Sequence, residues 1–193
     1  MLKPTLITPQ RFIHQKSVIR GEEFGVLCWN TQKLTETLAF QIELARILRK
    51  YPTLFLLLQE AKLTLNSNSQ FPQWSYVIAP NIQTKRSVFG VLTASQSAFN
   101  DVQPRLSTGR EGMIATFKSH MISSHPLDHN QSLLIVNVHA INFVSAKYFL
   151  REMELLKLEL QEHNGPLIVA GDFNVWSYQR RRYLQAFCDS IGL

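Results

Sequence analysis

The sequence predicts an α/β fold in which two mixed β-sheets pack into a sandwich flanked by helices. Three observations support this fold class. The chain has a strand-helix-strand pattern over residues 24–58, then apolar runs with short or polar connections over residues 74–138, then a helix-strand-helix pattern over residues 146–191. Strands separated by a helix favour parallel pairing and consecutive strands favour antiparallel pairing, so mixed sheets are expected.

The first unit is predicted from apolar runs and helix signals. Residues 24–29 form a short apolar run typical of a buried strand. Thr35 is suited to cap a helix, which Tyr51 ends because the residue before a proline avoids the helical region. Residues 54–58 predict the next strand. Both strands are apolar on both faces, as in a covered sheet.

The rest of the chain predicts consecutive strands and then two helices. Strands are expected at residues 74–79, 89–94, 113–117 and 133–138, and polar loops at residues 64–72 and 119–131. A helix over residues 146–162 stops at Asn164-Gly165-Pro166. A buried strand over residues 167–170 and a final helix over residues 178–191 complete the prediction.

Length and composition limit the domain organisation. The 193 residues suffice for one domain. Residues 1–23 show no clear periodicity and are predicted to be an N-terminal arm, which leaves residues 24–193 as the domain. No apolar stretch approaches the roughly 18 residues of a membrane span, and no signal-peptide core is present, so a cytoplasmic location is expected. Cys28, in a predicted buried strand, and Cys188, in a predicted helix, suggest no disulfide framework.

The charge balance favours acidic partners. Twenty Lys and Arg residues against fourteen Asp and Glu residues give a net charge of +6. A basic surface attracts polyanions such as nucleic acid, phosphoinositides or an anionic membrane. The alternative is a basic protein whose charge serves only solubility.

Polar residues at or just after predicted strands are the candidates for chemistry. They are Asn30, Glu60, His139, Asp172 and Asn174. Ligand crevices in open α/β sheets form at strand ends, so these side chains are expected to converge if the strands run the same way. Carboxylates, an amide and a histidine form a set suited to metal-assisted phosphate hydrolysis.

Each of these residues also has a purely structural interpretation. A Glu after a buried strand is often a helix cap or an ion-pair partner, and a single His usually makes a local hydrogen bond. The Gly171-Asp-Phe-Asn174 segment is also compatible with a simple turn, because Gly, Asp and Asn favour turns. The constellation therefore carries more information than any of its members.

Four segments, in order, resemble the motifs of the endonuclease/exonuclease/phosphatase superfamily. They are Trp29-Asn30, Leu58-Gln59-Glu60, Asn137-Val-His139 and Gly171-Asp-Phe-Asn174. The resemblance covers residues 24–177 and is closest to a bacterial YafD-like branch. It implies the superfamily's four-layer α/β/β/α, deoxyribonuclease-like fold and the hydrolysis of phosphodiester bonds.

The resemblance also implies a role for each site residue. Glu60, assisted by Asn30, would bind Mg²⁺, for which Mn²⁺ can substitute. Asp172 would orient or deprotonate the attacking water, or protonate the leaving oxygen, and Asn174 would hold Asp172 and the phosphate. His139 would donate to a non-bridging phosphate oxygen.

The sequence departs from the family after Asn174. The family's later Asp and its Ser-Asp-His motif have no counterpart, and Asp128-His129 precedes the Gly-Asp-Phe-Asn motif and lies in a polar loop. We therefore expect a domain that is incomplete at its C-terminus and hydrolyses little or nothing as it stands. Its exposed sheet edge predicts poor solubility, self-association in a dimer that covers the edge, or a longer natural protein of which this chain is a piece. Replacement of the missing histidine by His14, His120, His125 or His129 is not expected.

Three further residues are candidates for binding substrate. Arg110 and Arg180 could contact phosphates, although the run 180–182 also fits a solvated helix face. Trp176 could stack on a base, although core packing is the alternative. Hydrolysis of DNA is the function favoured by the sequence. The alternatives are a phosphatase or lipid phosphodiesterase of the same superfamily, and a non-catalytic phosphate-binding module.

Overall fold

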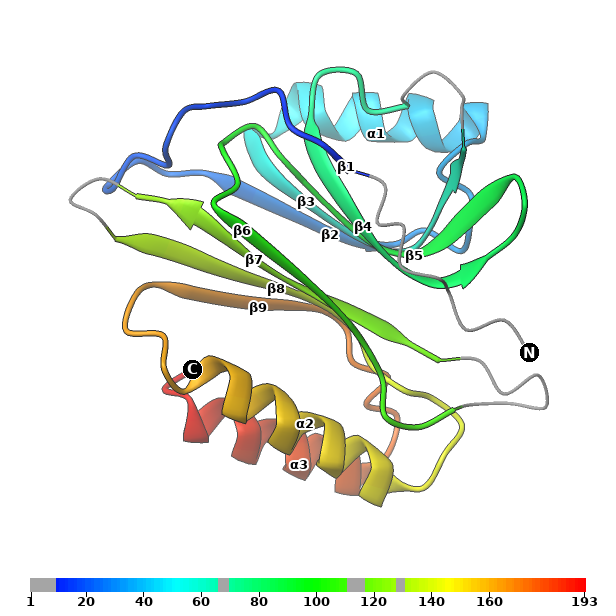
Figure 1. Cartoon of the computed structure of the whole chain (residues 1–193), viewed down its shortest axis with the longest axis vertical. Helices are drawn as coiled ribbons and strands as arrows, with labels where there is room; N and C mark the ends of the chain where they lie inside the picture. The colour runs from blue at the N-terminus through cyan, green and yellow to red at the C-terminus, as the bar shows by residue number, and fades with distance from the viewer. Residues whose placement is uncertain (1–9, 66–69, 111–116, 128–130) are drawn as a thin grey trace.

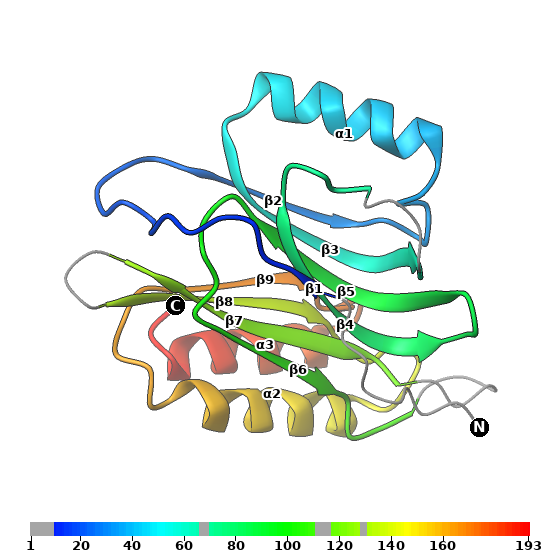
Figure 2. The same ribbon diagram turned by 45° about the horizontal axis from the view of Figure 1, so that its top comes forward.

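Two β-sheets lie face to face between helices in the computed structural model, which describes residues 10–65, 70–110, 117–127 and 131–193. Helix α1 (Leu38–Lys50) covers the outer face of one sheet, and α2 (Ala146–Leu160) and α3 (Tyr178–Ser190) cover the outer face of the other (Figures 1 and 2). The two-sheet α/β sandwich predicted from the sequence is confirmed.

The first sheet has five strands in the order β1-β4-β5-β3-β2. Strands β2 and β3 are parallel and the other pairs are antiparallel. The strands are β1 (Gln10–Arg11), β2 (Gly25–Asn30), β3 (Thr53–Thr64), β4 (Ser75–Gln83) and β5 (Ser87–Ser95).

The second sheet has four strands in the order β6-β7-β8-β9. Only β8 and β9 are parallel, with Asn137 opposite Ala170 and His139 opposite Asp172. The strands are β6 (Asp101–Leu106), β7 (Ser119–Pro126), β8 (Ser132–His139) and β9 (Leu167–Asp172).

The apolar core forms three layers. Phe40 and Leu44 of α1 pack against outward-facing side chains of the first sheet, such as Leu58. Between the sheets, Leu57 and its neighbours meet side chains of the second sheet such as Ile135. Beneath the second sheet, its outward side chains pack against the apolar faces of α2 and α3. Burial on both faces explains why the strands read as continuous apolar runs.

Strands β6 and β7 correct the sequence prediction. The expected polar loop over residues 119–131 is a strand as far as Pro126, because Ser119, Ser123 and His125 are buried and find hydrogen-bond partners inside the sandwich. Strand β6 was not predicted. The strand expected at residues 113–117 lies mostly outside the described residues, and Phe117 itself belongs to no strand.

Two smaller predictions are also wrong. The cap of α1 is Thr37, whose hydroxyl accepts from Phe40 N at 3.2 Å. Thr35 is buried, and its hydroxyl donates to Lys62 O and accepts from Lys62 N, so it fixes the loop to β3. Cys28 is exposed because β2 is the last strand of its sheet and has one neighbour.

The described part of the predicted N-terminal arm lies against the sandwich. Strand β1 pairs with β4, and Val18 is buried and forms a bridge to Leu127. Strands β2 and β9 are both edge strands of the described sheets. Self-association through an exposed sheet edge stays a prediction. No described helix has the length and apolarity needed to cross a membrane.

The buried imidazole of His125 should make the fold sensitive to acid. Burial lowers the pKa of His125 from 6.5 to about 4. Its Nδ1 lies 2.9 Å from Ala98 O and its Nε2 lies 3.0 Å from Ser123 Oγ, so the neutral ring fits with one donor and one acceptor. Between pH 6.5 and 4 the unfolded chain binds more protons than the folded chain, so the free energy of unfolding falls as the pH falls through this window.

The expected loss from His125 alone is on the order of 3 kcal/mol, from about 1.4 kcal/mol per pKa unit. Urea unfolding at pH 7, 6, 5 and 4 measures it. His125→Gln should flatten the pH dependence whatever its effect at pH 7, because it removes this buried titratable ring. A His125→Gln chain with the parent's slope would contradict the prediction.

Candidate functional site

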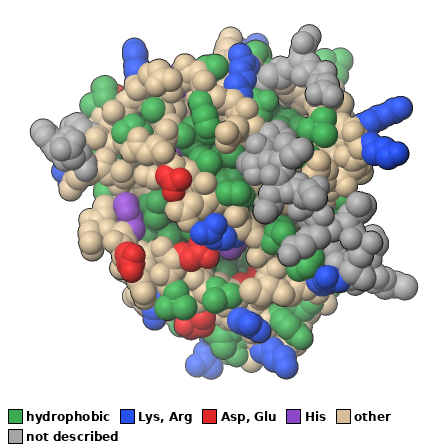
Figure 3. Space-filling view, viewed as in Figure 1, with side chains coloured by type: hydrophobic (Ala, Val, Ile, Leu, Met, Phe, Trp, Pro, Cys, Tyr) green, Lys and Arg blue, Asp and Glu red, His purple; other side chains and the backbone are tan. Residues whose placement is uncertain are grey.

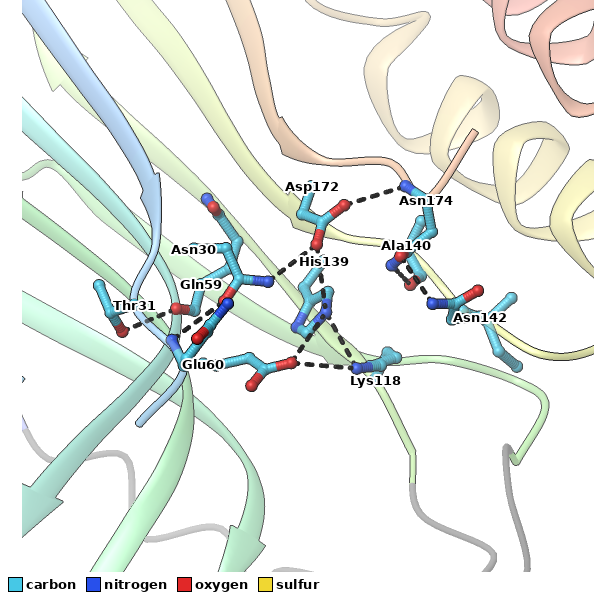
Figure 4. A network of polar contacts seen from close by, with 12 residues as sticks. Asn30, Thr31, Gln59, Glu60, Lys118, His139, Ala140, Asn142, Asp172 and Asn174 are labelled. Atoms are coloured by element: carbon cyan, nitrogen blue, oxygen red, sulfur yellow. Dashed lines mark hydrogen bonds and ion pairs between the residues drawn. The ribbon is translucent and has the colours of Figure 1, made fainter. Parts of the chain in front are cut away.

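A cavity of about 510 Å³ opens where strands of both sheets end, and it brings together five predicted site residues. Figure 4 shows several of their side chains pointing toward one another. In the space-filling view, acidic and basic side chains are scattered over one face of the molecule (Figure 3). The lining residues are Asn30, Gln32, Lys33, Glu60, Asn81, Ile82, Phe89, Lys118, His139, Asn142, Phe143, Asp172 and Asn174.

Glu60 reaches the cavity through a break in the regular pairing of β3. The sequence placed Glu60 just after a strand, but β3 continues to Thr64, and its register with β5 shifts between Leu58 and Ala61. Glu60 has φ 50°, a left-handed conformation that is uncommon in a non-glycine residue. The irregularity breaks the regular alternation of side chains along β3, so that the Glu60 carboxylate points toward the cavity.

Backbone strain is concentrated around this cavity. Among the described residues, five non-glycine residues have positive φ angles, and all five line it: Gln32, Lys33, Glu60, Phe143 and Asn174. Each such residue costs on the order of 1–3 kcal/mol and persists only where its surroundings hold it. Such clustering is typical of functional sites and marks this cavity independently of any motif.

Asp172 is held by two hydrogen bonds. Asn30 Nδ2 donates to Asp172 Oδ2 at 2.8 Å, and Asn174 N donates to Asp172 Oδ1 at 3.1 Å. The Asn30 bond links the edge strands of the two sheets. Gly171 precedes Asp172 with φ 147°, and a Cβ there would lie 2.0 Å from Val138 O, so only glycine allows β9 to approach β8 this closely.

Asn142 was missed by sequence reasoning and fixes the other side of the site. Its Nδ2 donates to Asn174 Oδ1 at 2.8 Å, and its Oδ1 accepts from Trp176 Nε1 at 2.7 Å and from Phe143 N at 2.9 Å. Asn174 Nδ2 donates in turn to Ala140 O at 2.9 Å. The loop after β8 and the loop after β9 are thus joined through side-chain amides.

His139 is buried between the two carboxylates. Its Nε2 lies 3.7 Å from Glu60 Oε1 and 3.9 Å from Asp172 Oδ2. Burial, and then the charge of Lys118, lower the pKa of His139 to about 4, with Asp172 opposing the change. Lys118 Nζ lies 2.9 Å from His139 Nε2. Because an ammonium only donates, Nε2 accepts here, and the ring proton of this neutral imidazole is on Nδ1.

Lys118 is the second residue that the sequence did not reveal. Its side chain is 12% exposed, and its Nζ lies 3.8 Å from Glu60 Oε1. The only local sequence signal is a lysine directly after Phe117, within a predicted strand and loop. Its place in the cavity depends on the pairing of β7, which sequence reasoning did not identify.

The donor set fits a hard divalent cation. Among the described residues, no group of three or more His, Cys, Asp or Glu side chains is arranged to hold a metal ion. Mg²⁺ needs only one or two carboxylates because it retains several waters. The carboxylate of Glu60 faces the cavity, and Asn30 Oδ1, which accepts from Gln32 N at 3.1 Å, is the other oxygen donor expected from the sequence.

The three predicted substrate-binding residues do not line this cavity. Arg180 was predicted to contact phosphate or solvent, and both interpretations are wrong because the side chain is fully buried and donates to backbone carbonyls. Trp176 is 61% exposed, which excludes the core-packing alternative. Arg110 is exposed, with its guanidinium 4.9 Å from the centre of the Phe117 ring. Substrate contact by Trp176 and Arg110 stays a prediction.

No other described histidine lines the cavity. His14 Nε2 lies 2.9 Å from Gln73 O, and His120 and His125 are enclosed in the second sheet and between the sheets. Asp128 and His129 lie outside the described residues. Within the described chain, His139 is therefore the histidine available for chemistry in this cavity.

A buried amide pair connects the two halves of the site. Gln59 Nε2 donates to Asn137 Oδ1 at 2.6 Å, and Asn137 Nδ2 donates to Leu92 O at 2.9 Å. Gln59 precedes Glu60 on one sheet, and Asn137 lies two residues before His139 on the other. This pair sets the position of Glu60 relative to His139.

Comparisons with known proteins give a consistent result. The model of the Endonuclease/Exonuclease/phosphatase family matches residues 27–189. A UPF0294 protein of Erwinia tasmaniensis is 29% identical over 182 residues, covering 91% of this chain and 65% of the relative. A UPF0294 protein of Yersinia pestis is 32% identical over 179 residues, covering 90% and 66%. The chain thus spans about two-thirds of the length of these relatives. They agree with the YafD-like branch expected from the sequence.

Solved structures share the fold at low sequence identity. An endonuclease/exonuclease/phosphatase family protein from Leptotrichia buccalis superposes with a TM-score of 0.64 at 13% identity, covering 86% of this chain and 73% of that chain. Sphingomyelinase C from Streptomyces griseocarneus gives 0.59 at 16% identity, covering 86% and 68%. The 3′ phosphatase NExo from Neisseria, bound to product DNA hairpin, gives 0.58 at 18% identity, covering 86% and 70%.

Proposed function

Because this chain belongs to the endonuclease/exonuclease/phosphatase family, we propose that its cavity binds a divalent metal ion and hydrolyses a phosphodiester, with DNA as the first substrate to test. One observation carries the proposal. Side chains from the ends of β2, β8 and β9 and from the register shift within β3, on two different sheets, meet in one cavity whose backbone is strained.

The residues divide the chemistry between them. Glu60, with Asn30, would hold Mg²⁺ or Mn²⁺, which supplies Lewis acidity to a phosphoryl oxygen when it is bound. Asp172 is oriented by Asn30 and Asn174, so its carboxylate can position the attacking water and take a proton from it, or protonate the leaving oxygen. His139 would donate to a phosphate oxygen through Nε2 once that nitrogen carries the proton.

Nucleic acid suits the rim of the cavity. Phe143 lines it with 81% of its surface exposed, and Trp176 is exposed beside Asn142. Exposed aromatic rings can stack on bases. Lys and Arg side chains are dispersed over the face in Figure 3 and do not form one stripe. Lys118, which lines the cavity with its Nζ 3.8 Å from Glu60 Oε1, is placed to meet a phosphate.

A non-catalytic phosphate-binding module is the second candidate. It is favoured by the way the described polar groups are already paired, with Lys118 against His139 and Asn30 against Asp172. The described cavity also has no second histidine to activate water. Slow hydrolysis is therefore the expected behaviour of the 193-residue chain.

The test combines a substrate panel with one site variant. The purified monomeric chain is incubated with Mg²⁺ or Mn²⁺ and plasmid DNA, an abasic oligonucleotide, bis(p-nitrophenyl) phosphate or sphingomyelin vesicles. We expect slow, metal-dependent cleavage that falls to background in Asp172→Ala, because this carboxylate acts on turnover and is not part of the core. Asp101→Ala, at the exposed Asp101 of β6, should cleave like the parent.

The outcomes separate the candidates. Cleavage of DNA with none of sphingomyelin supports the nuclease, and the reverse supports a lipid phosphodiesterase. Saturable binding of the oligonucleotide without cleavage supports the phosphate-binding module. Equal metal-dependent rates for Asp172→Ala and the parent would contradict the proposed site.

A further inference from the structure

Lys118 places a fixed positive charge beside the proposed metal ligand. Its backbone is anchored on both sides, since Lys118 N donates to Ser107 Oγ at 2.9 Å and Ser107 N donates to Lys118 O at 2.8 Å. Its nearly buried ammonium lies 3.8 Å from Glu60 Oε1 and 2.9 Å from His139 Nε2 (Figure 4). The lysine therefore belongs to the cavity and not to the surrounding surface.

This position puts Lys118 in conflict with a second cation. Any cation bound directly to Glu60 Oε1 must lie close to the ammonium, and two positive charges a few ångströms apart repel each other. Glu60 is one carboxylate with one negative charge, which the ammonium already balances in part. A divalent ion can bind well only when Lys118 acquires another anion.

A phosphodiester supplies that anion. Lys118 has three donors on a flexible stem, and its present acceptor, His139 Nε2, is the nitrogen proposed to face the phosphate. A phosphate that accepts from Lys118 would release His139 and draw positive charge away from Glu60. This shift of the Lys118 ammonium toward the phosphate would let bound phosphate favour metal binding and bound metal favour phosphate binding.

We propose, building on the function above, that Lys118 competes with the divalent metal for Glu60 and that a bound phosphate relieves this competition. Metal and phosphate then bind cooperatively, and each raises the affinity for the other by the same factor. Lys118 is a positioning and selectivity residue in this scheme. It keeps the cavity from binding the metal firmly without substrate.

Lys33 provides the matched comparison. It lines the same cavity from the loop after β2, and its side chain is exposed. Within the described part of the chain, no carboxylate lies at ion-pair distance from Lys33. Lys33→Met therefore removes the same charge from the same cavity without removing a contact to Glu60.

The experiment measures Mn²⁺ affinity by calorimetry and by the paramagnetic resonance of free Mn²⁺, with and without dimethyl phosphate. For the parent, dimethyl phosphate should tighten Mn²⁺ binding several-fold, a usual size for coupling between two ligands. Lys118→Met should bind Mn²⁺ about 10-fold more tightly without phosphate, since like-charge repulsion is removed, and should lose the response to dimethyl phosphate. Lys118→Arg and Lys33→Met should both keep the parent's response.

Each result bears on a different claim. Mn²⁺ binding that is undetectable in the parent even with dimethyl phosphate, or that persists in Glu60→Gln, overturns the proposed function and this inference with it. Glu60-dependent binding that Lys118→Met leaves unchanged or weakens overturns the role of Lys118 alone. Circular dichroism and thermal unfolding check each variant. If Lys118→Met does not fold, Lys118→Gln replaces it with the same expected outcomes.

Discussion

Glu60→Gln should lower the affinity of the chain for Mg²⁺ or Mn²⁺ by about 100-fold or more while the chain stays folded. The carboxylate is the one acidic group that the β3 irregularity directs to the proposed metal position, and hard cations depend on the charge of their ligands. The side chain is 28% exposed and its ion pair with Lys118 is long, so little of the fold's stability depends on it.

The control is another glutamate paired with a lysine. Glu36 Oε2 lies 2.7 Å from Lys62 Nζ and does not line the cavity, so Glu36→Gln should keep the parent's metal affinity. Calorimetric titration of the three chains at pH 7 gives the comparison. Similar dissociation constants for the Glu60→Gln chain and the parent would remove Glu60 from the metal site.

Arg180→Met should destabilise the chain by roughly 3 kcal/mol or more, because three carbonyl oxygens lose a charged donor and each unsatisfied buried group costs about 1–3 kcal/mol. The guanidinium donates to Ile141 O at 2.7 Å, Val144 O at 3.0 Å and Asn174 O at 3.2 Å. It also lies 5.0 Å from the Trp176 ring and 5.2 Å from the Phe149 ring. Methionine fills the space but supplies no donor, so buried carbonyls lose their partner.

The neighbouring Arg181 provides the control for Arg180→Met. Arg181 lies on the exposed side of the same helix turn, and Arg181→Met should change stability by no more than about 0.5 kcal/mol. Urea unfolding of the parent and both variants measures the difference. Equal unfolding midpoints for Arg180→Met and Arg181→Met would show that the buried hydrogen bonds contribute little.

The Arg180 contacts also matter for the site. Residues 141 and 144 flank Asn142 and Phe143, which line the cavity, and Asn174 is itself a proposed site residue. The Arg180→Met chain should therefore lose site geometry along with stability, although Arg180 does not line the cavity.

Much of the fold was predictable because its strands are buried on both faces. The apolar runs that became β3, β5 and β8 need no partner information to be recognised. Strand β7 was not predicted because its Ser and His side chains are polar but buried in the sandwich, where they form hydrogen bonds with groups distant in sequence. Strand β6 contains Pro104 and has mostly partly exposed residues, so its pattern is weak.

The same distinction applies to the site. Asn30, Glu60, His139, Asp172 and Asn174 belong to segments whose order and strand context are visible in the sequence. Lys118 was not predictable, because its proximity to Glu60 follows from how the second sheet packs on the first. The prediction for Arg180 was wrong because a run of three arginines resembles a solvated helix face. The carbonyl groups that accept from the buried guanidinium lie in the loops after β8 and β9, which the local sequence around Arg180 does not reveal.

The hydrogen bond between Gln59 and Asn137 has a consequence for anyone who engineers this protein. Both amides are almost completely inaccessible, and replacing both by apolar residues of similar shape can leave such a core equally stable or more stable. A selection for heat resistance alone would therefore tend to discard the pair. The two sheets could then pack in a slightly different relative position, and the distance between Glu60 and His139 would change with it. Thermostability and a correctly spaced site are competing demands at these two positions, so a library that randomises them needs a second screen for ligand binding.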